Sequence, residues 1–173
     1  MRGLFFCSKP KYFWKVYYKP KTTSYTIDEA KQRIENYCAY RERCHSEVVS
    51  KLESMGMIPE AIEKILSDLI QSNYLNEQRF AIQFALGKFR IKHWGKRRIE
   101  RELKFKGLSP FTIKKAIQAL EKEDYEGCFH SLFDKKLDSF SAFEGQKLKS
   151  KLIRYFQYRG WENELIFNRL EQL

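Results

Sequence analysis

A pattern centred on glycine recurs three times in this sequence and constrains the fold more than any other feature. The copies are KLESMGMIPEAIEKILSDL (51–69), ELKFKGLSPFTIKKAIQAL (102–120) and YFQYRGWENELIFNRLEQL (155–173). They place Gly56, Gly107 and Gly160 at intervals of 51 and 53 residues, with apolar residues at matching offsets on both sides. Periodicity of this kind is typical of tandem arrays, in which each small unit buries its apolar face against its neighbours.

Each period is long enough for three helices of ordinary length with short turns between them. We therefore predict an all-α fold in which three tandem three-helix repeats form an elongated, curved array. The predicted divisions of the chain are a basic and aromatic extension over 1–25, followed by repeats over 26–73, 74–121 and 122–173. Each repeat glycine is expected to adopt a positive φ between the second and third helices of its unit.

Local signals predict where several helices begin. Thr26, with Glu29 three residues later, forms a capping-box pattern before the first helix. Ser46 is the predicted N-cap of the second helix, Pro59 falls in the first turn of the third, and Asn76 caps the fourth. In the third repeat, the apolar spacing predicts helices over 122–137 and about 142–159.

The net charge of +11 is concentrated in two places. Residues 1–25 carry six basic residues and no acid, and residues 88–115 carry eleven against two acids. Such an excess favours an anionic partner, namely nucleic acid, an anionic membrane or an acidic protein surface. The aromatic residues of the extension could stack on bases or form a short strand, and an unstructured extension is the alternative. They do not separate onto helical faces as a membrane-surface helix would require.

The basic stretch FRIKHWGKRRIERELKFKGLS (89–109) contains a stripe of cations at helical spacing. Arg97, Arg101 and Lys104 would share one face of a helix whose opposite face carries apolar residues, and Arg98 could pair with Glu102 across one turn. An ordinary solvated helix face is the alternative interpretation. The density of the stripe favours an anion-binding surface, for which the predicted contact residues are Arg97, Arg98, Arg101, Lys104, Lys106, Lys88, Arg90, Lys92 and Lys96. The neighbouring Trp94 could belong to the core, staple the start of the helix or stack on a base.

No pattern in the chain indicates catalysis, a cofactor or a metal site. The cysteines at 7, 38, 44 and 128 form no CxxC pair, and the eight glycines are scattered rather than gathered in a phosphate-binding loop. No stretch approaches the length of an apolar membrane span. We therefore expect a cytoplasmic, monomeric, non-catalytic protein with no membrane partner.

Four pieces of the sequence resemble the RecX family of bacterial RecA regulators. They are RERCHSEVVSKLESMG, YLNEQRFA, WGKRRIERELKFKGLS and RGWENELI, and the resemblance covers about 27–173. It implies a helical three-repeat protein without catalytic activity, which binds the RecA filament on DNA and lies in its helical groove. There it restrains filament growth, ATP hydrolysis and strand exchange.

Two other functions remain open from the residues alone. A stand-alone DNA-binding module would also use short helical units with a basic second helix. A helical scaffold for some other acidic protein would need neither DNA nor the recombinase. Whether DNA is contacted directly or through the filament is equally open.

Overall fold

The computed structural model describes residues 25–173, and this part of the chain is entirely helical, as predicted. The helices are α1 (Ile27–Tyr40), α2 (His45–Ser54), α3 (Pro59–Gln71), α4 (Glu77–Lys92), α5 (Lys96–Phe105), α6 (Pro110–Ala119), α7 (Tyr125–Ser139), α8 (Gly145–Arg159) and α9 (Asn163–Glu171). A short 3-10 turn, η1 (Leu120–Lys122), follows α6. The predicted extension over 1–25 lies almost wholly outside the described residues.

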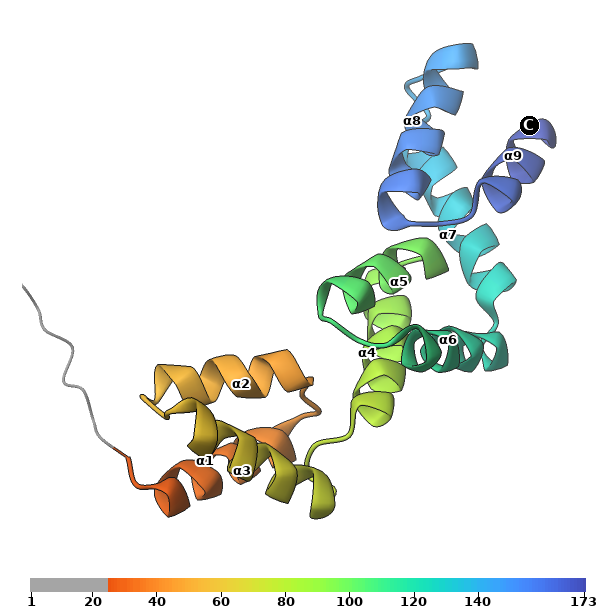
Figure 1. Ribbon diagram of the computed structural model, residues 1–173. Helices are drawn as coiled ribbons and strands as arrows, with labels where there is room; N and C mark the ends of the chain where they lie inside the picture. The colour runs from red at the N-terminus through yellow and green to blue at the C-terminus, as the bar shows by residue number, and fades with distance from the viewer. Residues whose placement is uncertain (1–24) are drawn as a thin grey trace, which may run out of the picture.

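The helices form three successive groups of three that follow one another in chain order, giving an elongated, curved array (Figure 1). Below, α1–α3, α4–α6 and α7–α9 are called the first, second and third units. Gly56, Gly107 and Gly160 have φ values of 78°, 82° and 81°, so all three take the left-handed conformation that was predicted for them. No helix in the described part of the chain is long and apolar enough to cross a membrane.

Two of the predicted helix starts, at Thr26 and Asn76, are confirmed by side-chain contacts, and Pro59 lies in the first turn of α3 as predicted. The Thr26 hydroxyl accepts a hydrogen bond from the Glu29 amide, and the Glu29 carboxylate accepts one from the Thr26 amide, completing the capping box. Asn76 accepts from the Arg79 amide at the start of α4. Ser46, however, is not the N-cap of α2. The cap is Cys44, and the Ser46 hydroxyl donates to the carbonyl of Lys106 in the second unit.

The first two helices of the third unit begin later than predicted. Helix α7 starts at Tyr125 rather than at 122, because η1 extends the preceding segment and the Asp124 side chain caps the Gly127 amide. Helix α8 starts at Gly145 rather than near 142. Both differences shorten the helices at their N-terminal ends and leave the order of elements unchanged.

The apolar core is divided unequally among the units. The first unit has a core of its own, to which Ala30, Ile34, Leu52 and Leu69 contribute. The second and third units share one continuous core, in which aromatic residues of α4, α7, α8 and the α8–α9 turn meet. Among the described residues of the first unit, Cys44 alone belongs to this larger core. The second and third units are therefore fused through their interior, whereas the first unit is joined to them mainly at its surface.

Candidate binding interface

Helix α5 presents a stripe of cations on its outer face. Ile99 and Leu103 are completely buried and fix the orientation of this short helix. The side chains of Arg97, Arg101 and Lys104 are consequently exposed. Within residues 25–173, none of the three has an ion pair. Their charges are therefore available to an external anion.

The other predicted contact residues are mostly held by internal partners. Arg90 donates two hydrogen bonds to the Glu123 carboxylate, at 2.7 and 3.1 Å. This contact holds the pKa of the Glu123 carboxyl below its usual range. The Lys106 ammonium lies 2.6 Å from the Glu47 carboxylate, and the Lys96 ammonium lies over the ring of Tyr125.

Arg98 lies between the second and third units. Its guanidinium lies over the rings of Trp94 and Tyr158, 4.1 and 4.7 Å from their centroids, and donates to the Tyr158 carbonyl. No ion pair between Arg98 and Glu102 is present in the described chain, so the pairing suggested by their spacing is wrong. Trp94 is partly buried against the larger core and also has the Lys88 ammonium over its ring.

The junction between the second and third units is built from backbone as well as side chains. The Gly95 amide donates to the Arg159 carbonyl at 2.9 Å, and the Arg97 amide donates to the Gly160 carbonyl at 3.1 Å. Trp161 is buried and its indole N–H donates to the carbonyl of His93. The start of α5 is therefore fixed to the turn between α8 and α9, which determines where the stripe points.

A buried phenol completes this junction. The Tyr125 hydroxyl accepts a hydrogen bond from the Lys96 amide at 2.9 Å and donates one to the Glu162 carboxylate at 2.7 Å. Burial, together with the negative charge of Glu162, raises the pKa of Tyr125 far above its ordinary value. The phenol thus stays protonated and serves as a fixed hydrogen-bonding bridge between the units.

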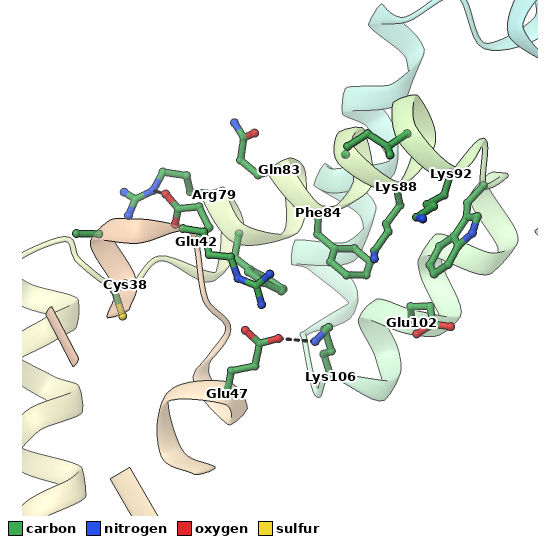
Figure 2. A pocket seen from close by; sticks show the side chains of 16 residues that line it. Cys38, Glu42, Glu47, Arg79, Gln83, Phe84, Lys88, Lys92, Glu102 and Lys106 are labelled. Carbon is green, nitrogen blue, oxygen red and sulfur yellow. Dashed lines mark hydrogen bonds and ion pairs between the residues drawn. The ribbon is translucent and has the colours of Figure 1, made fainter. Parts of the chain in front are cut away.

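The first and second units enclose a groove of about 830 Å³ that was not predicted from the sequence (Figure 2). Its walls come from the end of α1, the start of α2 and one face of α4, and its far side comes from α5 and Trp94. Phe84, Lys88 and Lys92 line it from α4, while the Glu47–Lys106 ion pair spans it. No local spacing in the sequence indicated this groove, because its walls come from two different units.

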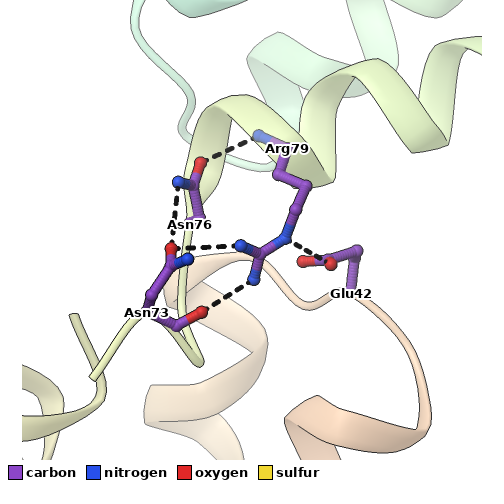
Figure 3. A network of polar contacts seen from close by, with 4 residues as sticks. All are labelled: Glu42, Asn73, Asn76 and Arg79. Atoms are coloured by element: carbon purple, nitrogen blue, oxygen red, sulfur yellow. Dashed lines mark hydrogen bonds and ion pairs between the residues drawn. The ribbon is translucent and has the colours of Figure 1, made fainter. Parts of the chain in front are cut away.

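A polar network holds the first unit to the start of α4 (Figure 3). Arg79 binds the Glu42 carboxylate and donates to both the side-chain oxygen and the carbonyl of Asn73, at 3.1 and 2.9 Å. Asn73 adopts a positive φ of 59°, and its side-chain oxygen also accepts from Asn76. The connection between these units is therefore made largely of charged and amide groups. Among residues 25–173, no group of three His, Cys, Asp or Glu side chains could hold a metal ion.

These features define a class of protein: a tandem three-helix-repeat protein with an exposed basic face on its central unit. Family models describe two of the units. The model of the second three-helix domain of RecX matches residues 76–117, and that of the third three-helix domain matches residues 123–168. The two matches together cover about half of the chain, and the chain belongs to the RecX family.

Relatives and solved structures agree with this assignment. The regulatory protein RecX of Lactobacillus johnsonii is 27% identical over 136 residues, which are 79% of this chain and 50% of that protein. The regulatory protein RecX of Prosthecochloris aestuarii is 27% identical over 145 residues, 84% of this chain and 93% of that protein. The crystal structure of RecX from Lactobacillus salivarius has the same fold, with a TM-score of 0.74 at 20% identity, and the match covers 85% of this chain and 96% of that one. The chain spans about half the length of several of the curated relatives it matches.

Proposed function

We propose that this protein binds the RecA–DNA filament and inhibits the ATPase and recombinase activities of RecA, thereby modulating homologous recombination and DNA repair. It acts by binding rather than by catalysis, as a monomer in the cytoplasm and without a cofactor. Membership of the RecX family supports a regulatory role.

The observation that carries the proposal is the stripe of Arg97, Arg101 and Lys104 on α5. All three side chains are exposed on the central unit, and no acidic side chain in the described chain is paired with them. Three unneutralised cations on one helix face fit the phosphates of DNA or the carboxylates of a filament surface. Lys92 is also exposed and has no ion pair in the described chain, whereas Arg90, Arg98 and Lys106 are held by partners within the fold.

The test is the rate of ssDNA-dependent ATP hydrolysis by RecA, titrated with this protein at fixed salt and with DNA in excess. Inhibition at ratios well below one protein per RecA is expected, because a filament-bound inhibitor affects many subunits. Inhibition that appears only when the protein coats the DNA, and that more DNA relieves, would contradict the proposal.

That second outcome would favour a stand-alone DNA-binding module, for which the same stripe is suitable. Such a module would bind DNA tightly without RecA, and its affinity would fall steeply as salt is raised.

A further inference from the structure

The groove between the first and second units exposes an apolar side chain, Ile91, and contains the ring of Phe84, over which the Lys88 ammonium lies. On α4, Ile91 is 74% exposed and lines the groove together with the half-buried ring of Phe84. Both residues lie on α4 and line the groove, and Figure 2 shows the Phe84 ring on the side of Glu47 and Lys106. An exposed isoleucine beside an accessible aromatic ring provides apolar surface for a partner.

Gly87 lies between these two residues in the interior of α4 and also lines the groove. A Cβ atom added to Gly87 would meet no atom within 4 Å, so nothing in the described fold requires a residue without a side chain there. Glycine destabilises a helix interior relative to alanine. Because Gly87 has no side chain, the backbone of α4 is open there to close approach by another chain.

The charges around the groove are unequal once the internal pairs are taken into account. Glu42 is paired with Arg79 and Glu47 with Lys106. The remaining charged lining residues are Arg41, Lys88, Lys92 and Glu102, and none of these has an ion pair within residues 25–173. The unpaired lining is thus net positive and complements a partner that bears carboxylates.

We propose that this groove is a docking site for a segment of the recombinase that carries apolar side chains flanked by carboxylates. The inference rests on the proposed function and adds a protein-binding site distinct from the basic stripe. The apolar side chains of the segment pack on Phe84 and Ile91, its backbone approaches Gly87, and its carboxylates meet Lys88 and Lys92. A nucleic acid fits less well, because the exposed apolar side chain of the groove is the aliphatic Ile91, which offers a base neither a hydrogen-bond partner nor a ring to stack on.

The first test places a photo-crosslinking benzoylphenylalanine at Ile91 and, as a matched control, at Ile70. Ile70 is also an exposed helical isoleucine, 52% accessible, and does not line the groove. Each variant is irradiated with purified RecA filaments on ssDNA. Crosslinks from position 91 to a RecA segment rich in apolar and acidic residues are expected. Crosslinks to DNA or to a second copy of this chain, or yields no higher than at position 70, would overturn the inference.

The second test compares Ile91→Glu with Ile70→Glu in the RecA ATPase titration. Ile91→Glu should weaken inhibition by about tenfold or more, which corresponds to about 1.4 kcal/mol of binding energy, whereas Ile70→Glu should leave it unchanged. Thermal unfolding confirms that both variants fold. If wild-type protein does not inhibit RecA, the proposed function itself fails. If wild type inhibits and Ile91→Glu inhibits equally well, only the docking site is wrong.

Discussion

Gly95 and Gly160 lie so close together that a Cβ atom on Gly95 would be 2.3 Å from the carbonyl oxygen of Gly160. A Cβ on Gly160 would lie equally close to the amide nitrogen of Arg98. These neighbours are backbone atoms in hydrogen-bonded segments, so they cannot move aside as a flexible side chain could. The two glycines therefore allow α5 and the α8–α9 turn to meet backbone to backbone.

Gly95→Ala should destabilise the protein by forcing the second and third units apart. We expect a loss of about 1–3 kcal/mol in the free energy of unfolding, the usual range for overpacking, measured by urea denaturation. Gly87→Ala is the matched control, since the added methyl group meets open space in a helix. It should stabilise the protein by about 0.5–1 kcal/mol. Equal effects of the two substitutions would show that the close approach at Gly95 does not hold the units together.

Tyr125→Phe removes the hydroxyl that links Lys96 to Glu162. The Lys96 amide and the Glu162 carboxylate both lose a partner at a partly buried junction. A loss of about 1–3 kcal/mol in stability is expected, again from urea denaturation. Tyr40→Phe, at a side chain that is 87% exposed, should change stability little. If both variants unfold alike, the Tyr125 hydrogen bonds do not stabilise the junction.

Charge reversal of the stripe should remove the proposed activity without unfolding the protein. We expect Arg97→Glu, Arg101→Glu and Lys104→Glu together to abolish RecA inhibition. In a direct DNA-binding assay, the logarithm of the binding constant falls linearly with the logarithm of the salt concentration. For the triple variant, the magnitude of this slope should be smaller by about two to three, roughly one for each lost phosphate contact. The measurements are the ATPase titration and DNA affinity at several salt concentrations.

The control for this variant makes the same change of charge elsewhere, at the exposed Lys51, Lys64 and Lys147. It should retain inhibition, because these lysines lie on other units. Loss of inhibition in the control as well would mean that net charge, rather than the α5 stripe, is responsible. Full inhibition by the stripe variant would remove the stripe from the proposed interface.

Lys106→Met should loosen the first unit relative to the second, because it breaks the ion pair with Glu47. Spin labels on Ser54 and Gln118 report the distance between these units, and labels on Gln118 and Gln146 report the fused second and third units. The first distance distribution should broaden in the variant, and in wild type at high salt, since screening weakens a partly exposed ion pair. The second distribution should stay unchanged. Equal broadening of the two distance distributions would contradict the conclusion that the molecule bends between its first and second units.

The sequence predicted the features that depend on local spacing. The buried positions of Ile99 and Leu103 and the exposed stripe opposite them follow from helical periodicity, and the left-handed Gly107 follows from its place after a helix. Features that depend on contacts between units could not be predicted in this way. Ser46 and Lys106 are 60 residues apart in the chain, as are Arg98 and Tyr158. No local pattern in the sequence indicates that the members of either pair are in contact.

The groove escaped prediction for the same reason. Apolar residues fall on more than one face of α4, so the sequence alone does not separate those that line the groove from those that face the core. Phe89 is buried against Tyr125 and Trp161, whereas Ile91, two positions later, lies on another side of the helix and remains exposed. The first unit is placed beside α4 by polar contacts such as the one between Arg79 and Glu42, which have no periodic signature.

The division of the core also determines how the array can bend to fit the groove of a helical filament. Because the second and third units share one interior and the first has its own, bending is confined to a single joint. A molecule lying along a filament would then be rigid over its second and third units and would bend only where the first unit joins them. The fused units would fix the registry of contacts, and the first unit would adjust to changes in filament pitch without disturbing them.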